Sequence, residues 1–257
     1  MNSSERRRWL LDRVADTGFV AVDEAMKATT SSASTIRRDI NALAADGVVQ
    51  RVHGGAIRAD GSTEVPQGLR EATEVEAKRA IAAVAARRLA GVATVGLTGG
   101  STTTAVARNL PPGIRRVVTN SLAVASVVLS SHAAELVVTG GRARAASLEL
   151  VGDLSIRAME SINLDVAIIG ADGVDATRGV TTHDDVEAAT NRSMMKRADR
   201  VILVADGTKI GRTSFARICG VDEIDLLITS ASLDDIAGSQ LSGSGLDVVR
   251  ASGERPA

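Results

Sequence analysis

Hydroxyl and guanidinium side chains are concentrated between residues 32 and 40. Ile36 and Ile40 would lie on one face of a helix, which places Arg37 and Arg38 on or beside the outward face. Hydroxyls at a helix N-terminus suit phosphate contacts, and arginine has the forked geometry that recognises guanine in the major groove. An ordinary solvated amphipathic helix is the alternative, but further basic residues on a following hairpin favour a DNA-binding surface. The candidate DNA-contacting residues are Ser32, Ser34, Thr35, Arg37, Arg38, Arg51 and His53.

A second polar cluster, from Thr98 to Thr104, joins a predicted strand to a predicted helix. Gly99 and Gly100 let the backbone approach a ligand closely, and the hydroxyls and free N–H groups of such a turn can bind an oxyanion such as phosphate. The cluster is not a Walker A loop, because no lysine follows the glycines at the required spacing. A plain strand-to-helix connection is the alternative interpretation.

Polar residues also follow the other predicted strands of this region. Because the carboxyl ends of parallel strands meet at one edge of a sheet, these clusters predict a site there for a small anionic ligand. Some charged residues nearby have two interpretations. Glu187 contacts the ligand or is simply solvated, with Arg192 nearby. Arg142 and Arg144 either pair with a ligand phosphate or face solvent. The clusters are Thr119-Asn120-Ser121, Gly140-Gly141, Gly170-Ala171-Asp172-Gly173 and Asp206-Gly207-Thr208-Lys209.

The first 58 residues have the pattern of a small DNA-binding domain. Apolar residues at helical spacing predict helices over 5–16 and around 36–43, with a further short helix between them. Two short β-prone runs between Val48 and Ala56, ending in a glycine turn, predict a hairpin. Three small helices followed by such a β-wing indicate a winged helix-turn-helix. We expect Arg6, Arg7 and Arg8 to form a solvated face of the first helix.

Residues 59–75 contain Gly, Ser and Pro with little apolar content and are predicted to be a linker. From residue 76 to 257, apolar strands alternate with helical stretches, beginning with an alanine-rich helix over 76–90. This alternation predicts an α/β domain with a mostly parallel sheet and helices on both of its faces. The expected strands are Val92–Leu97, Arg116–Thr119, Glu135–Thr139, Leu164–Gly170, Val201–Ala205 and Leu226–Thr229.

Composition narrows the classes of function. The 257 residues include only three aromatic side chains, Trp9, Phe19 and Phe215, which excludes a row of stacking platforms for single-stranded nucleic acid. The net charge of −1 conceals a mild asymmetry: residues 1–58 carry nine Lys/Arg and seven Asp/Glu, a net of +2, and the remainder carries 21 and 24, a net of −3. The slightly basic part is therefore the one expected to meet phosphate.

The composition also indicates the cellular compartment and whether a metal site is expected. Cys219 is the only cysteine, so no disulfide can form within the chain, and we expect it to be a buried small residue. The three histidines lie far apart, and no zinc site or other metal or cofactor is expected. No apolar run approaches the roughly 18 residues of a membrane span. Together these features predict a cytoplasmic protein with no membrane partner.

The motifs resemble those of a known family. Thr35-Ile36-Arg37-Arg38-Asp39, Gly47 and Arg51-Val52-His53-Gly54-Gly55-Ala56 look like the DNA-binding signature of the DeoR family of bacterial transcription regulators. The later clusters look like the sensor domain of that family, which is similar to ribose-5-phosphate isomerase and binds phosphorylated sugars. The chain departs from the family pattern at Ala25, Thr29, Ser31 and Thr98. By this resemblance the effector-binding residues are Gly99, Gly100, Ser101, Thr102, Thr103, Asn120, Gly141, Asp172, Gly173, Glu187 and Lys209.

Two functions from different classes fit these patterns. One is a transcriptional repressor of carbohydrate catabolism genes, a homo-oligomer (dimer or tetramer) that binds operator DNA under the control of a phosphorylated sugar. The other is a sugar-phosphate isomerase with a DNA-binding appendage. Isomerisation needs a placed base and an electrophile, and the lysine that the isomerase resemblance would place soon after Asp172 is absent until Lys196. The sequence therefore favours the regulator, with no catalytic residues.

Overall fold

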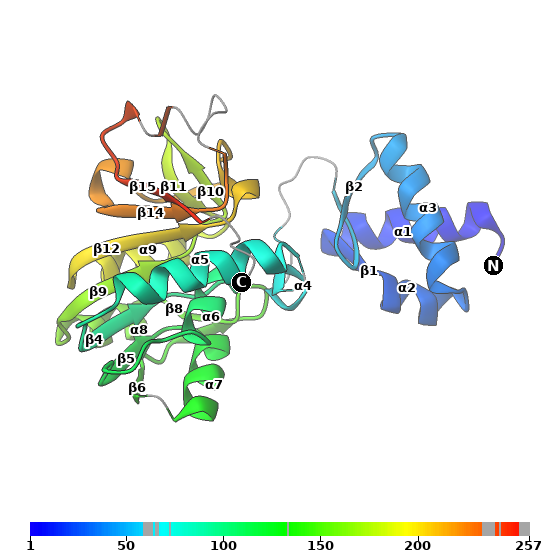
Figure 1. Cartoon of the computed structure of the whole chain (residues 1–257). Coiled ribbons are helices and arrows are strands. Elements are labelled where there is room, and N and C mark those ends of the chain that lie inside the picture. The colour runs from blue at the N-terminus through cyan, green and yellow to red at the C-terminus, as the bar shows by residue number, and fades with distance from the viewer. Residues whose placement is uncertain are drawn as a thin grey trace, which may run out of the picture. The chain divides into compact units, whose positions relative to one another are not determined.

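The computed structural model describes residues 1–58, 64, 67–71, 73–132, 134–232, 240–241 and 243–251 (Figure 1). The chain forms two compact units, Met1–Thr73 and Glu74–Ala257. The division falls inside the segment 59–75 that we predicted to be a linker, and a short helix, α4 (Gln67–Glu71), lies within it.

The first unit packs three helices against a small antiparallel sheet with strand order β1-β3-β2. Its core is aliphatic, with Leu10, Val14, Ile36 and Ile40 buried and the ring of Trp9 packed at its margin. This arrangement confirms the predicted winged helix-turn-helix, with β2 and β3 as the wing. The elements are α1 (Ser3–Thr17), β1 (Phe19–Ala21), α2 (Val22–Thr29), α3 (Ala33–Ala45), β2 (Val49–Val52) and β3 (Gly55–Arg58).

Local signals in the sequence set the ends of these helices. Asn2 and Glu5 form a reciprocal capping box at the start of α1, and Gly18 ends that helix in the left-handed conformation. Ser32 caps α3 by accepting a hydrogen bond from the Thr35 backbone N–H at 3.3 Å. Caps of this kind satisfy N–H groups that no helical carbonyl can reach, so they fix where α3 begins.

The second unit is built on a parallel sheet, in which the described residues form seven strands in the order β15-β14-β12-β9-β4-β5-β6. The predicted strands over 116–119 and 226–229 match β5 and β14 residue for residue, and the other four predicted strands differ from theirs by a few residues at one end. The strands are β4 (Thr94–Leu97), β5 (Arg116–Thr119), β6 (Glu135–Val138), β9 (Leu164–Ile169), β12 (Ala198–Ala205), β14 (Leu226–Thr229) and β15 (Val248–Arg250).

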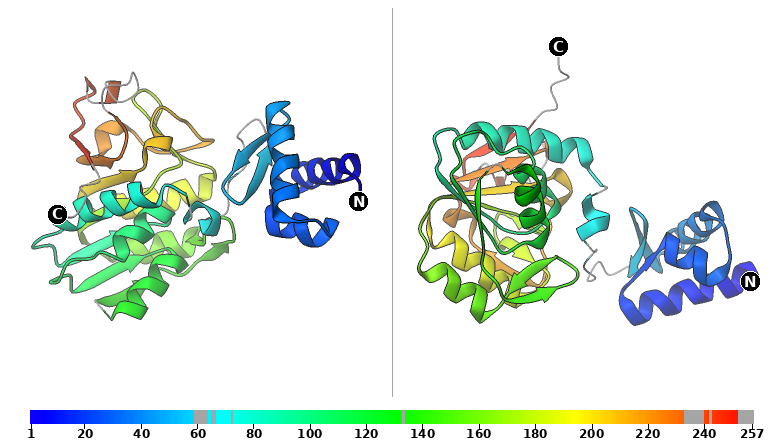
Figure 2. Two further views of the ribbon diagram at one scale, coloured as in Figure 1. Left: turned by 45° about the vertical axis from the view of Figure 1, so that its right-hand side comes forward. Right: turned by 90° about the horizontal axis from the view of Figure 1, so that it is seen from below.

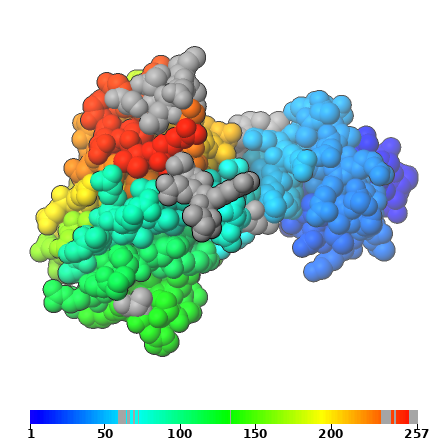
Figure 3. Space-filling view, in the orientation of Figure 1, coloured from blue at the N-terminus to red at the C-terminus, as the bar shows by residue number. Residues whose placement is uncertain are grey.

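Helices cover both faces of this sheet, as predicted (Figures 1 and 2). Val95 and Leu97 of β4 point to one face, where they pack with Ile81, Val106 and Val124 from three helices. Figure 3 shows these helices, coloured cyan to green, forming the outer surface on that side. The helices on this face are α5 (Val75–Arg88), α6 (Ser101–Ala107) and α7 (Leu122–Ser131).

The opposite face packs against two further helices. Ala167 of β9 points there and contacts a cluster that includes Met159 and Met194. These methionines come from α8 (Asp153–Glu160) and α9 (Asp185–Met195), respectively. Because alternate residues of a strand face opposite sides, the continuous apolar runs of β9 and β12 are what a sheet buried on both faces requires.

Short antiparallel strands that the sequence did not reveal lie beside the main sheet. They form a hairpin, β7–β8, and a small sheet of order β10-β11-β13. Each strand has three or four residues, too few for a period-2 pattern to be recognised. They are β7 (Arg142–Arg144), β8 (Glu149–Val151), β10 (Gly173–Asp175), β11 (Gly179–Thr182) and β13 (Ala216–Cys219), with single 3₁₀ turns at Gly207–Lys209 and Val221–Glu223.

Candidate functional site

The start of α3 carries a cluster of hydroxyl groups. Ser32 Oγ lies 2.9 Å from both Ser34 Oγ and Thr35 Oγ1. Ser32 and Ser34 are exposed, and Thr35 is half-buried. The first N–H groups of a helix lack intrahelical acceptors, so hydroxyls and N–H groups together offer hydrogen-bond donors to a phosphate at this end.

The two arginines of α3 are exposed, as the sequence predicted. Arg37 and Arg38 follow the buried Ile36, and within the described residues neither has a hydrogen-bond or ion-pair partner. Arg51 on β2 and His53 in the wing turn are exposed as well. The seven predicted DNA-contacting residues therefore lie on α3 and the wing of one small domain.

Asp39 lies on the buried side of α3 and holds two arginines of α1. Arg6 Nε donates to Asp39 Oδ2 at 2.7 Å, and Arg7 Nε donates to Oδ1 at 3.2 Å. Our expectation of a solvated face was wrong for Arg6, which is 11% exposed on the carboxylate, whereas the Arg7 side chain stays 40% exposed and Arg8 is exposed. Burial raises the pKa of Asp39, but the hydrogen bonds from Arg6 and Arg7 outweigh it and hold the pKa of that carboxyl below its usual value.

In the second unit, the predicted phosphate-binding turn follows β4. Thr103 and Thr104 direct their hydroxyls back to the Gly100 carbonyl oxygen at 2.8 and 2.7 Å. Gly99 is pressed against the side chain of Glu149, since a Cβ at that position would lie 2.4 Å from Glu149 Oε1. Only glycine fits there. The turn residues Ser101 and Thr102 are largely buried at the carboxyl end of the strand.

Asn120, at the end of β5, is the centre of a buried polar group. Its Nδ2 donates to Glu149 Oε2 at 2.8 Å and to Asn191 Oδ1 at 3.1 Å. Its Oδ1 is buried and has no hydrogen-bond partner among the described residues. A buried amide oxygen without a partner is uncommon in folded proteins, and a ligand is one way to satisfy it.

A chain of charged and hydroxyl groups crosses the ends of β9 and β12. Lys209 Nζ lies 3.9 Å from Asp172 Oδ1. The Thr182 hydroxyl contacts Asp172 Oδ2 at 3.0 Å and Glu187 Oε1 at 2.5 Å. The guanidinium of Arg144 in turn pairs with Glu187. Lys209 keeps a quarter of its side chain exposed, while Asp172 and Glu187 are buried.

Helix α9 joins the two groups. Glu187 and Asn191, one turn apart, lie on the same face of that helix. Glu187 belongs to the series of polar contacts that ends at Lys209, and Asn191 Oδ1 accepts a hydrogen bond from Asn120. Most of the predicted effector residues are therefore brought to the carboxyl edge of one sheet. Gly141 and Gly173 are tightly packed: Cβ atoms there would lie 2.9 Å from the Val151 oxygen and 2.5 Å from the Arg212 oxygen.

Three of the residues in these groups were not predicted. Glu149, Asn191 and Thr182 are all buried and hydrogen-bonded to predicted residues. Glu149 had a signal in the sequence, because it stands between two leucines in a strand-like run. Side chains alternate along a strand, so Glu149 points to the face opposite that of the two leucines. Asn191 had none, because its partner Asn120 is 71 positions away along the chain, and Thr182 had none, because it lies in a short strand that the sequence did not reveal.

The structure also decides between the alternative readings of nearby charges. Glu187 is not a solvated partner of Arg192; it is buried and pairs with Arg144. Arg192 instead pairs with Glu223 at 3.0 Å. Arg144 is therefore engaged inside the protein, and Arg142 is exposed.

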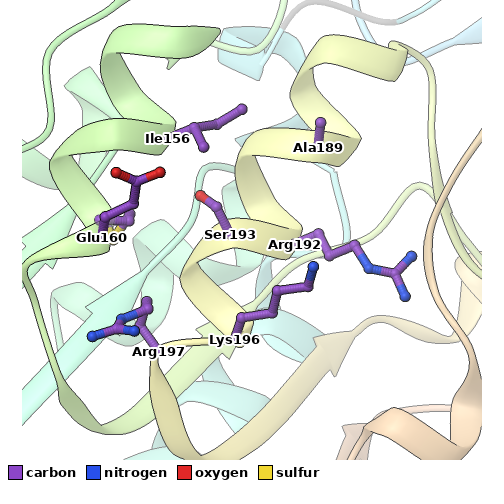
Figure 4. Close-up of a pocket in the computed structure, with 8 residues that line it drawn as sticks. Ile156, Glu160, Ala189, Arg192, Ser193, Lys196 and Arg197 are labelled. Atoms are coloured by element: carbon purple, nitrogen blue, oxygen red, sulfur yellow. The ribbon is translucent and has the colours of Figure 1, made fainter.

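A hollow of about 440 Å³ lies elsewhere, between α8 and α9 (Figure 4). Ile156 and Glu160 reach it from α8, and Ser193 and Lys196 from α9 and its C-terminus. None of the predicted effector residues lines it. The guanidinium of Arg197 at its edge is already bound to the Ile162 carbonyl and to Asn163.

Cys219 ends β13 of the small sheet and is buried in the core, as expected. Burial raises the pKa of the thiol to about 12. Such a thiol is neutral near pH 7 and a poor nucleophile. Among the described residues, no helix is both long and apolar enough to cross a membrane.

Comparison with known proteins identifies both units. A family model described as the DeoR-like helix-turn-helix domain matches residues 6–61, and one described as the DeoR C terminal sensor domain matches residues 73–231. The HTH-type transcriptional regulator GlpR of Haloferax volcanii is 36% identical over 251 residues, covering 97% of this chain and 98% of that protein. The glycerol-3-phosphate regulon repressor of Escherichia coli K12 is 29% identical over 232 residues, covering 90% and 92%.

Among solved structures, ribose 5-phosphate isomerase A of Methanocaldococcus jannaschii aligns with a TM-score of 0.39 at 17% identity, over 51% of this chain and 52% of that one. A likeness this distant gives no information about activity. The sequence relatives are named as regulators and repressors, and both family models describe the parts of a regulator. The chain belongs to the DeoR family and is a DNA-binding transcriptional regulator rather than an enzyme.

Proposed function

We propose that this regulator is a repressor of carbohydrate catabolism genes and that a phosphorylated sugar, bound at the carboxyl edge of the parallel sheet, controls its affinity for operator DNA. One observation carries the effector site: the Gly99–Thr103 turn, the unsatisfied oxygen of Asn120 and the Lys209–Asp172 pair all lie at the ends of neighbouring strands. Turn N–H groups and an ammonium group suit a phosphate, whereas amide and carboxylate oxygens suit sugar hydroxyls.

The DNA surface in this proposal is α3 with the wing. Arg37 and Arg38 would contact bases in the major groove, and the hydroxyl cluster at Ser32 together with Arg51 and His53 would contact the backbone. We propose a homo-oligomer, dimer or tetramer, because two copies of α3 are needed to bind a repeated operator. Such a regulator acts in the cytoplasm, where its operator and a phosphorylated metabolite meet.

The effector would act by stabilising an arrangement of the oligomer that fits the operator less well. A coupling free energy of about 1–3 kcal/mol changes the affinity for the operator by roughly 5- to 150-fold. Reciprocity then requires that operator DNA weaken the binding of the effector by the same factor.

The test begins with a thermal-shift screen of the full-length protein against phosphorylated sugars, glycerol 3-phosphate and the same compounds without phosphate. A ligand of the native state raises the melting temperature by mass action. Operator DNA selected from a random pool then serves in a release assay with the compound that stabilises the protein most. A screen in which no phosphorylated compound acts, or a compound that binds without changing DNA affinity, would contradict the proposal.

A further inference from the structure

The buried pair Asn120–Glu149 has the geometry of a specificity element. We propose that Glu149 and Asn120 Oδ1 together accept hydrogen bonds from a hydroxyl-bearing part of the effector, so that Glu149 makes the site prefer a polyhydroxylated phosphate ester to bare inorganic phosphate. This inference rests on the proposed function, because it assigns a task to one residue within that effector site.

The orientation of the Asn120 amide follows from its neighbours. The carboxylate of Glu149 can only accept, so the amide nitrogen of Asn120 must face it, at 2.8 Å. The second hydrogen of the same nitrogen goes to Asn191 Oδ1 at 3.1 Å. Both donors of the amide are therefore used, and the remaining group, Oδ1, is an acceptor.

Asn120 as a whole is 1% exposed, and its Oδ1 has no hydrogen-bond partner among the described residues. A buried acceptor without a hydrogen bond destabilises the protein, and a ligand group that donates a hydrogen bond to it removes this cost. The group that completes this position must be a donor such as a hydroxyl. The dianionic phosphate group of an ester has only acceptor oxygens and does not fit this position, whereas the hydroxyls of its sugar do.

Glu149 lies between this acceptor and the phosphate-binding turn. Its Oε2 holds Asn120, and its Oε1 is so close to Gly99 that a Cβ on that glycine would lie 2.4 Å away. A carboxylate at this place accepts hydrogen bonds and has no donor for a deprotonated phosphate oxygen. The same carboxylate accepts a strong, charge-assisted hydrogen bond from a hydroxyl of an esterified phosphate.

The backbone holds the carboxylate in place before any ligand arrives. Leu150 N–H donates to the Asn120 carbonyl oxygen at 2.6 Å, and Ser121 and Glu149 pair as an isolated antiparallel bridge. These contacts fasten β8 to the end of β5. Because the acceptors are preorganised, a ligand with matching donors loses little affinity to reordering of the protein.

The experiment compares two probes on the full-length protein and on Glu149→Gln. Calorimetric titration measures the dissociation constants of inorganic phosphate and of the phosphorylated sugar that stabilises wild type most. We expect Glu149→Gln to bind the sugar phosphate about tenfold or more weakly and inorganic phosphate as well as or better than wild type. The preference for the ester therefore falls at least tenfold. Glu160→Gln, the same change at an exposed carboxylate of α8, serves as the matched control and keeps the wild-type preference.

The outcomes separate the two proposals. If both probes bind wild type and Glu149→Gln changes both constants by the same factor, Glu149 has only a structural role and the inference is wrong, although the effector site stands. If no phosphate compound binds wild type, the proposed function fails and this inference falls with it. Should Glu149→Gln not fold, as judged by circular dichroism, Glu149→Asp retracts the carboxylate by one methylene and must lower the same preference.

Discussion

Arg6 of α1 and Asp39 of α3, which are 33 positions apart in the chain, are joined by a hydrogen bond of 2.7 Å between Nε and Oδ2. Both side chains are largely buried, at 11% and 4% exposure. Asp39 follows directly after Arg37 and Arg38 in the sequence, so the contact fixes the first helix against the helix that carries the candidate base contacts. Asp39 therefore holds the candidate DNA-binding helix in place from its buried side.

Replacing Asp39 with Asn should destabilise the first unit and weaken DNA binding indirectly. Removing one partner of a buried ion pair leaves the charge of the other partner uncompensated, which lowers the free energy of unfolding by about 3–5 kcal/mol. Urea unfolding followed by circular dichroism measures it. Asp12→Asn, at an exposed position of α1, is the matched control and should change the free energy of unfolding by less than about 0.5 kcal/mol. Equal stabilities of the two variants would show that the pair contributes nothing.

The pair also makes stability depend on pH on the acid side. The pKa of Asp39 in the folded protein lies below its usual value of 3.8. The stabilisation is therefore fully present above the pKa of the unfolded state and is lost as the pH falls through the lower folded value. We expect the difference in stability between wild type and Asp39→Asn to be constant from pH 5 to pH 7 and to shrink below about pH 4. Unfolding curves at pH 6 and pH 3 measure it, and a difference that grows on acidification would contradict the ion-pair explanation.

Arg37→Ala should weaken binding to the selected operator by roughly 1–3 kcal/mol and relax the preference at one base position. Arg37 is exposed and without a partner in the described part of the protein, so its loss leaves the fold intact. Gel-shift titration at fixed salt measures the affinity. Arg8→Ala removes an exposed arginine of α1 and is the control for loss of charge alone. An unchanged operator affinity for Arg37→Ala would remove Arg37 from the candidate base contacts.

Lys209→Ala should leave operator binding intact and abolish the response to the effector. Its ammonium lies 3.9 Å from Asp172 and keeps a quarter of its side chain exposed, as expected of a group that can also meet a phosphate. DNA-release assays over a range of effector concentrations measure the response. Lys196→Ala, which removes a lysine beside the α8–α9 hollow, is the control. Release of DNA by Lys209→Ala at wild-type effector concentrations would mean that the site is misplaced.

Gly99→Ala tests the contact between the turn and Glu149 directly. The added methyl group would lie 2.3 Å from Glu149 Cγ, so the turn or the β7–β8 hairpin must move. Overpacking of this kind costs typically about 1–3 kcal/mol. We expect a lower melting temperature and loss of effector-induced stabilisation. Gly243→Ala, where a Cβ meets open space, should change neither property. Wild-type behaviour of Gly99→Ala would show that the turn tolerates displacement.

Cys219 should react with iodoacetamide only after unfolding. It is fully buried, and burial raises its pKa to about 12, so almost no thiolate exists near pH 8. Mass spectrometry of protein treated with and without urea measures the labelling. Rapid labelling of the folded protein at pH 8 would indicate an exposed thiol, and with it a reactivity that the structure does not provide.

Local patterns determined much of this protein. Ile36, Ile40 and Leu43 at helical spacing specify α3, and the hydrogen-bonded cap at Ser32 starts it. Runs of aliphatic residues specify the strands of a sheet that is buried on both faces, and the polar clusters after them follow from strand ends meeting at one edge. These features depend on neighbours within a few residues, which is why the fold class and most candidate positions could be predicted from the chain alone.

Tertiary structure decided which of these residues meet. The sequence allowed Glu187 to be either an effector contact or a solvated residue beside Arg192, but packing of the β7–β8 hairpin against α9 gives it Arg144, which is 43 positions away. It left Arg6 as a surface residue, and the crossing of α1 with α3 buries it on Asp39. Glu149 reaches Asn120 and Gly99 only because the β7–β8 hairpin crosses the ends of two strands. Side-chain periodicity encodes the direction in which a residue points, whereas its partner is set by how separate elements pack.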